Sequence, residues 1–279
     1  MSRRTSIAAV CVALSTTLAA QDQAPGPRPI VVQGAMRLET ERLIGRLRNV
    51  TTERAGGWSF WRGTLDGYPV IVSRTLMGVA NGAVATALAA ERYHPIAILN
   101  QGTAGGHHAA MKNFDVVLGA SAVSIGGYKS PLRKKGAGSN AFEWQPIDVR
   151  GTAESGGEDL KEGTFARFPA DAALLAAARS VRSGYTRGRV VEGVIGSSDI
   201  WHEEVDLLAR FHTLYGTDVE EFETASAAQT ASLFGIPFLG IRIVTANVTN
   251  GSAYDAKTAE ACQDFVYEVV KAYIRTLKP

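Results

Sequence analysis

The stretch Val31-Val32-Gln33-Gly34-Ala35-Met36-Arg37-Leu38-Glu39 decides the fold class of this sequence. An apolar run leads into a glycine turn and then into a helical pattern, which predicts a buried strand followed directly by a helix. Glu39 then lies in the first helical turn, at the carboxyl end of the strand, where open α/β sheets bind ligands. An acid there also stabilises the positive end of a helix dipole, so the pattern allows either a catalytic residue or a helix-start acid.

The same alternation of strand and helix continues along the chain. Several strand-like runs are continuously apolar, as expected for a sheet covered on both faces. The alternation predicts an α/β fold, a three-layer α/β/α sandwich with a central mixed sheet. We expect strands over 29–33, 58–65, 68–75, 96–102, 115–124, 189–196 and 238–245, and helices over 39–47, 82–93, 171–183, 202–214, 224–234 and 255–277.

Composition and charge are those of an ordinary globular protein of 279 residues, 46% apolar and 20% charged. Residues 1–20 combine Arg3 and Arg4 with a short apolar run and two alanines, which predicts a cleavable export signal rather than a membrane span. Without them the chain has 27 basic and 27 acidic residues, so nothing favours nucleic acid as a partner. We therefore expect an exported protein, periplasmic or secreted, that binds neither nucleic acid nor a membrane.

The rest of the chain divides into a tether and one domain. Residues 21–28 contain proline and glycine in a polar context and are expected to form a flexible tether, and residues 29–279 are expected to form the domain. Within it, the glycine-rich residues 126–163 show no sustained period and predict a long loop. Cys11 would leave with the signal, so Cys262 would have no partner for an internal disulfide.

Three further segments carry candidate chemistry. Asn100-Gln101-Gly102-Thr103-Ala104-Gly105-Gly106 lets backbone amides approach a bound group and supplies the Thr103 hydroxyl, although a plain tight turn has the same pattern. Trp201, in 196–201, is either a stacking platform for a base or a packing residue. Phe222 and Glu223, in 220–225, can present a ring and a carboxylate together, as a sugar site requires, or belong to an acidic first helical turn.

No grouping of His, Cys and Asp in the sequence has the spacing of metal ligands. His107 and His108 are adjacent, and the side chains of neighbouring residues diverge. The sequence also lacks the P-loop, the Rossmann glycine spacing and the nucleophile-elbow motif of serine hydrolases. We therefore expect no metal and no other cofactor.

The order of these segments is more specific than any one of them. The series G-A-M-x-x-E, N-x-G-T-A-G-G, S-x-D-x-W and E-x-F-E-T-A, closed by Arg242-Ile243-Val244-Thr245, resembles the 5′-methylthioadenosine/S-adenosylhomocysteine nucleosidases. These belong to the wider family of purine nucleoside phosphorylases and uridine phosphorylases. The resemblance covers roughly residues 30–277, apart from 126–163. It implies a three-layer α/β fold, a homodimer, and cleavage of the N-glycosidic bond of a purine nucleoside.

The resemblance also implies roles for individual residues. Glu39 matches the acid that activates the water nucleophile, and Glu223 matches the carboxylate that holds the ribose hydroxyls. Trp201 matches the aromatic residue stacked on the base. The other substrate-binding positions implied in this way are Met36, Thr103, Ala104, Gly105, Phe222, Arg242 and Tyr254, of which Phe222 lies beside the ribose and Tyr254 closes the 5′ pocket.

One departure from the family pattern affects the purine end of the site. The family's aspartate, which protonates the purine at N7, is replaced by Ala246, and the nearest polar residue is Asn247, a third catalytic candidate. An amide can hydrogen-bond N7 but cannot protonate it at neutral pH. Two alternatives stay open: a phosphate-dependent phosphorylase, for which Arg74 is a nearby basic candidate, and a non-catalytic protein that binds or stores purine nucleosides.

Overall fold

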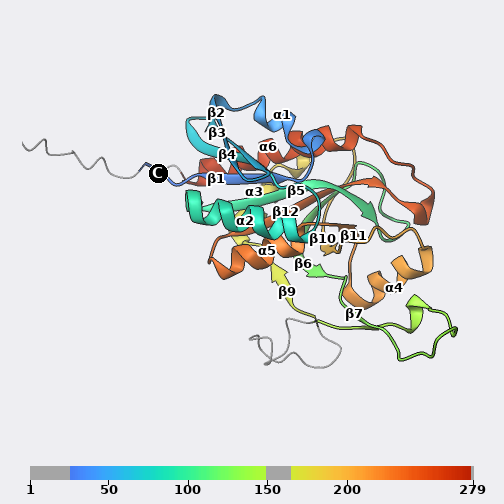
Figure 1. The fold of residues 1–279 in the computed structure, drawn as a ribbon. Helices are drawn as coiled ribbons and strands as arrows, with labels where there is room; N and C mark the ends of the chain where they lie inside the picture. The colour runs from blue at the N-terminus through green and yellow to red at the C-terminus, as the bar shows by residue number, and fades with distance from the viewer. Residues whose placement is uncertain (1–25, 149–164, 278–279) are drawn as a thin grey trace, which may run out of the picture.

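The computed structural model describes residues 26–148 and 165–277, and its centre is a large mixed β-sheet (Figure 1). Its core strands are continuously buried, which explains their unbroken apolar sequence. The strands of this sheet are β1 (Ile30–Gly34), β2 (Arg48–Ala55), β3 (Trp58–Leu65), β4 (Tyr68–Arg74), β5 (Ala97–Gly106), β6 (Val116–Ser124), β9 (Arg167–Pro169), β10 (Val190–Ser197), β11 (Val219–Glu221) and β12 (Phe238–Ala246).

The sheet is parallel at its centre and closes on itself at one end. β1 runs parallel to β4 and β5, and β12 runs parallel to β5. β12 then pairs with β6, β6 with β10, and β10 with β11. A short antiparallel pairing of β11 with the end of β5 completes a ring of five strands. The ring places the ends of β5, β10, β11 and β12 around one space.

Helices cover both faces of the sheet, which confirms the three-layer α/β/α prediction. On one face, α2 (Val79–Tyr93) packs against α5 (Thr224–Leu233); on the other, α6 (Lys257–Leu277) packs with α1 (Glu41–Ile44) and α3 (Ala172–Ser180). Figure 1 shows α2 and α5 in front of the sheet and α6 behind it. α4 (Val205–Tyr215) contributes Leu207, Leu208, Phe211 and Tyr215 to a separate apolar cluster with the end of β6.

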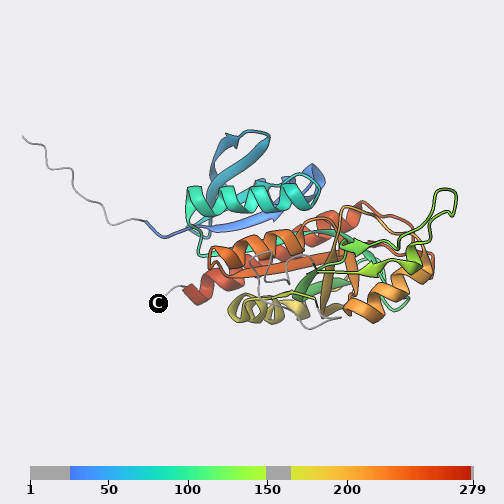
Figure 2. The same cartoon turned by 60° about the horizontal axis from the view of Figure 1, so that its bottom comes forward.

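The chain between β1 and β3 differs from the sequence prediction. The helix expected over 39–47 is a 3-10 turn, η1 (Arg37–Glu39), followed by the single helical turn α1. Residues 48–55 then form β2, which no pattern predicted. This strand is an edge strand with mostly exposed side chains, so it lacks the apolar alternation by which strands are recognised. β3 pairs with β4 along its length, so β2 is the outermost strand, and Figure 2 shows the blue hairpin of β2 and β3 projecting at one side of the molecule.

Part of the predicted loop 126–163 has structure of its own. Its described portion contains a two-stranded sheet of β7 (Tyr128–Lys129) and β8 (Gln145–Pro146), with the 3-10 turn η2 (Ala141–Glu143) between them. Arg210 on α4 donates to the carbonyl groups of Ala141, Phe142 and Trp144 and so fastens this segment to the domain. Residues 149–164 lie outside the described residues.

The predictions for the first 28 residues are largely outside the described part of the chain. The export signal over 1–20 and residues 21–25 of the tether are not described, and Gly26 to Arg28 form an extended, exposed lead into β1. None of the helices described has both the length and the apolarity to cross a membrane. Cys262 is unpaired and buried in α6, and its burial raises the pKa of its thiol to about 12.

Candidate active site

Glu39 occupies a site built to hold a carboxylate. The turn after β1 aims the backbone N–H groups of Ala35 and Met36 at Oε2, at 3.0 and 3.1 Å. Thr103 donates to Oε1 through its backbone N–H at 2.8 Å and its hydroxyl at 2.9 Å. The side chain of Glu39 is buried. Four donors on a buried carboxylate are far more than a helix-start acid needs, so the structure brings Glu39 and the glycine segment into one site.

Gly102 is required for this close approach. A Cβ atom at Gly102 would lie 2.6 Å from Oε1 of Glu39, which is closer than real contacts allow. The glycine segment therefore allows the Glu39 side chain, from the 3-10 turn η1 that follows β1, to lie directly against β5. This role differs from the plain tight turn that the same pattern allowed, because residues 97–106 continue as strand β5.

A second group of buried charges lies at the start of α5. Arg242 on β12 donates from Nε to Glu221 at 3.0 Å and from Nη2 to both Glu221 and Asn100. Burial alone would raise the pKa of Glu221. The charge of Arg242 and hydrogen bonds from Ser197, Arg242 and the backbone outweigh this effect, so the pKa is lowered. The main partner of Arg242 is thus Glu221, whereas the family resemblance implies that Arg242 binds substrate.

Glu223 is buried beside this ion pair but is only loosely paired. Its Oε1 accepts from the backbone N–H of Gly78 at 2.9 Å, and its Oε2 lies 3.7 Å from Nη2 of Arg242. Burial and the negative charges of Glu221 and Glu39 hold the pKa of Glu223 well above its ordinary value. A carboxylate in this state has unused capacity to accept hydrogen bonds, and two hydroxyl donors on a ligand would satisfy it.

Trp201 and Phe222 form an aromatic pair next to the glycine segment. Their ring centroids are 5.9 Å apart, and the indole covers Gly105 so closely that a Cβ there would lie 2.8 Å from it. Trp201 is 39% exposed, so its other surface faces solvent. The cavity beside it has only about 30 Å³ of space, room for about one water molecule. This cavity is too small for a purine base unless some of the residues that line it move.

Asn247 does not have a free amide. It caps the 3-10 turn η5 (Val248–Asn250): its Oδ1 accepts from the N–H and hydroxyl of Thr249, and its Nδ2 donates to the carbonyl groups of His108 and Met111. All four of its hydrogen-bonding positions are used within the protein. A contact between Asn247 and a purine would require these bonds to break, and the structure assigns the residue a capping role.

Two residues that the sequence analysis did not select line the same small cavity, together with Ala246: His202 and Glu220. Nδ1 of His202 lies 2.7 Å from Oε2 of Glu220, whose Oε1 accepts from the His202 backbone N–H at 2.8 Å. Burial would raise the pKa of Glu220, but the imidazoles of His107, whose Nε2 is 3.4 Å from Oε2, and of His202 lower it below its ordinary value. The acid-rich run 220–223 is visible in the sequence, but only the tertiary structure places Glu220 beside His202 at the cavity that Ala246 also lines.

The remaining predicted residues are placed as follows. Met36 is half-buried and contributes its backbone N–H to Glu39, and Ala104 is buried in β5. Tyr254 is 58% exposed, and its side chain makes no hydrogen bond, ion pair or ring contact with other described residues. Contacts therefore connect Glu39 with Thr103, Glu223 with Arg242, and Trp201 with Phe222 and Gly105, whereas none of these contacts includes Tyr254.

Comparisons with known proteins identify the family of this chain. The family model of the phosphorylase superfamily matches residues 29–275. A 5′-methylthioadenosine/S-adenosylhomocysteine nucleosidase of Bacillus thuringiensis (strain Al Hakam) is 29% identical over 220 residues, 77% of this chain and 84% of the relative. The corresponding Neisseria meningitidis enzyme, solved in complex with methylthio-immucillin-A, superposes with a TM-score of 0.71 at 25% identity over 88% of this chain and 99% of its own.

A third comparison shows the fold alone. The futalosine hydrolase of Helicobacter pylori strain 26695 has a TM-score of 0.70 at 19% identity and covers 88% of this chain and 97% of its own. The family match spans the domain from β1 to the last turn of α6, and it includes every strand around the buried carboxylates. This chain is a nucleosidase-like member of the phosphorylase superfamily.

Proposed function

We propose that the protein is an exported purine nucleosidase that hydrolyses the N-glycosidic bond of a nucleoside of the methylthioadenosine or adenosylhomocysteine type. The relatives with these names support the reaction class. The pattern of residues 1–20 supports export, and the family resemblance supports a homodimer. The chemistry is supported by the two buried carboxylates, Glu39 and Glu223.

The observation that carries the proposal is the hydrogen bonding of Glu39. In a site that binds phosphate through a glycine loop, the backbone amides and hydroxyls of that loop must be free for the anion. Here the N–H and hydroxyl of Thr103 both donate to the Glu39 carboxylate. Arg74 is likewise engaged: it donates to the Thr40 hydroxyl at 3.0 and 3.1 Å and lies 4.8 Å from the Trp61 ring centroid. This arrangement favours water over phosphate as nucleophile.

The two carboxylates have different tasks in this reaction. Glu39 accepts the proton of the attacking water as a general base. Glu223 accepts hydrogen bonds from the ribose hydroxyls and fixes the sugar. Cleavage passes through an oxocarbenium-like sugar, so both negative charges stabilise the positive charge that develops there.

His202 supplies the proton-donating group that Ala246 lacks. Glu220 binds Nδ1 of His202 and so fixes the ring, which leaves Nε2 for the imidazole edge of a purine. This is the same division of labour as a carboxylate that orients a catalytic histidine. A purine anion is a poor leaving group, and a hydrogen bond or proton at N7 makes it a better one.

The reaction is tested by incubating the purified protein with a panel of nucleosides, with and without phosphate, and measuring free base and sugar products by chromatography. The expected result is release of free purine and free ribose or its 5′-thio derivative at equal rates in both buffers. Strict dependence on phosphate with ribose 1-phosphate as product would establish a phosphorylase instead. Binding without turnover would establish the storage alternative.

The role of His202 is tested with two leaving groups. His202→Ala should lower turnover on adenine nucleosides by about 10- to 10³-fold, the span of one lost proton donor. It should change turnover on a nitrophenyl riboside by no more than about threefold, because that leaving group needs no protonation. His94→Asn is the control, since His94 is exposed at the end of α2, before β5 begins, whereas the site lies at the carboxyl end of β5. Equal losses on both substrates would show that His202 is only structural.

A further inference from the structure

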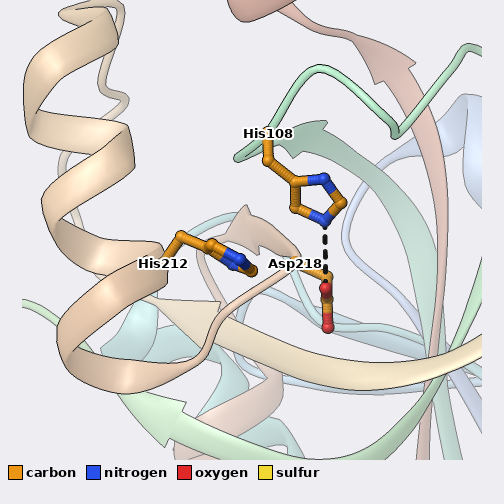
Figure 3. A group of neighbouring side chains, drawn as sticks. All are labelled: His108, His212 and Asp218. Carbon is orange, nitrogen blue, oxygen red and sulfur yellow. Dashed lines mark hydrogen bonds and ion pairs between the residues drawn. The ribbon is translucent and has the colours of Figure 1, made fainter.

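A second cluster of ligand-type side chains lies outside the carboxylate site. His108, His212 and Asp218 come from the segment after β5, the last turn of α4 and the residue before β11, and Figure 3 shows their side chains turned toward one another. One ligand atom from each lies within 4.8 Å of the others. Nε2 of His108 is 3.1 Å from Oδ1 of Asp218, and the two imidazole centroids are 4.6 Å apart.

His212 and Asp218 each use one polar atom for a hydrogen bond outside the cluster, and the other ligand atom of each remains available to a metal ion. Nδ1 of His212 lies 2.8 Å from the carbonyl oxygen of Thr217, to which it can only donate, so its Nε2 carries a lone pair. Oδ2 of Asp218 accepts from the Val194 N–H at 2.9 Å, next to a bulge in β10, and Oδ1 remains on the side of His108. Histidine ligands of metals are oriented in this way by a second hydrogen bond on the far nitrogen.

We propose that His108, His212 and Asp218 form a binding site for a divalent transition-metal ion of the zinc class. Two imidazoles and one carboxylate are a common donor set for such ions, whereas magnesium and calcium prefer oxygen ligands alone. Ligand atoms around a tetrahedral zinc ion lie about 3.3 Å apart, so small side-chain rotations suffice to close the site. The ion takes the place of the proton between His108 and Asp218. These two side chains are 28% and 23% exposed, which leaves room for a water as fourth ligand.

The position of the cluster gives the ion a structural role. It would join α4, the entry to β11 and the segment after β5, three elements that are separate in sequence. Leu208 on α4 lines the small cavity that His202, Glu220 and Ala246 also line, and the carbonyl of His108 accepts from Asn247. The ion therefore fixes one wall of that cavity without touching substrate. The inference does not rest on the proposed nucleosidase activity.

The experiment uses the untagged full-length protein after dialysis against a chelator. Titration with ZnCl2 in a calorimeter should show one site per chain, and CoCl2 should give the strong visible absorption of tetrahedral cobalt. Zinc at about 100-fold above its Kd should raise the Tm by about 5 to 10 °C. His108→Ala, His212→Gln and Asp218→Asn should each weaken zinc binding by at least about tenfold. Glutamine at 212 keeps an N–H for the Thr217 carbonyl.

His94→Asn provides the matched control, because His94 is an exposed histidine outside the cluster and its left-handed backbone suits asparagine. This variant should bind zinc as the parent does. Circular dichroism of each metal-free variant separates loss of a ligand from loss of fold. Absence of a stoichiometric binding event, absence of the cobalt absorption, or binding that survives in all three ligand variants would overturn the proposal.

Discussion

Glu39 shows how a single residue acquires a function from its surroundings. In sequence it is one acid in a helix-like pattern; in the fold it receives four hydrogen bonds, two from the turn after β1 and two from Thr103 on β5. These donors hold the carboxylate in one orientation, which is what a general base requires.

Replacing Glu39 with glutamine keeps its shape and removes the base. We expect Glu39→Gln to lower turnover by at least about 10²-fold with the fold intact. Steady-state kinetics and circular dichroism provide the measurements. Glu41→Gln, in the next turn and exposed, is the control and should retain activity. A fully active Glu39→Gln protein would show that Glu39 is not a catalytic base but only a helix-start acid.

Glu221 and Glu223 are neighbours whose pKa shifts have opposite signs, so they predict opposite effects on stability. The pKa of Glu221 is lowered, so its contribution to stability is present above its ordinary value of 4.5 and is lost as the pH falls through the lowered pKa. The pKa of Glu223 is raised, so its ionisation costs stability as the pH rises above 4.5 toward the raised value.

Glu221→Gln should therefore lower the free energy of unfolding at pH 7 by about 3 kcal/mol, because it leaves Arg242 buried without its main partner.

Glu223→Gln should raise the Tm at pH 7, with a difference that disappears near pH 4, while it lowers kcat/KM by about 10- to 10²-fold through loss of the ribose contacts. Thermal melts from pH 4 to 8 test both. A Tm for Glu223→Gln below that of the parent at pH 7 would contradict this assignment.

At the scale of elements, the segment from Tyr128 to Pro146 has few contacts of its own and depends on α4. Its strands β7 and β8 have two residues each, and Arg210 binds the carbonyls of its 3-10 turn. A segment of this kind opens locally at a low free-energy cost. The same helix contributes Leu208 to the small cavity that His202 and Glu220 line.

We expect Arg210→Ala to increase the rate of proteolytic cleavage within 128–146 by about tenfold, because three hydrogen bonds to backbone carbonyls are lost. The Tm of the domain should change by less than about 2 °C. Limited proteolysis with mass spectrometry locates the cuts. Arg182→Ala, at another exposed arginine, should leave the cleavage rate unchanged; equal protection of the segment in Arg210→Ala would show that other contacts hold it.

At the scale of the whole molecule, the ring of strands makes one site from distant parts of the chain. β5 supplies Thr103, β11 supplies Glu220 and Glu221, and β12 supplies Arg242 and Ala246. The short β5–β11 pairing closes the ring and so places Glu220 beside Gly105.

The export prediction also belongs to the whole molecule. Expression of the full chain in a bacterium with intact secretion should give a protein outside the cytoplasm whose mass lacks residues 1–20. Cell fractionation and intact-mass spectrometry test this. A soluble cytoplasmic product that still includes Met1 to Ala20 would rule it out. Light scattering on the same sample tests the expected homodimer.

The sequence by itself determined the α/β class, most of the central strands and the carboxylates Glu39 and Glu223. Buried parallel strands have unbroken apolar runs, amphipathic helices have a local periodicity, and the glycine and acid motifs keep a fixed order. It did not determine β2 or β11, because an exposed edge strand and a strand of three residues carry no such periodicity. Nor did it identify the partners of single side chains. His202 with Glu220, the occupied amide of Asn247, and the approach of His108, His212 and Asp218 all depend on elements far apart in the chain, which only the tertiary structure brings within hydrogen-bonding distance or close to it.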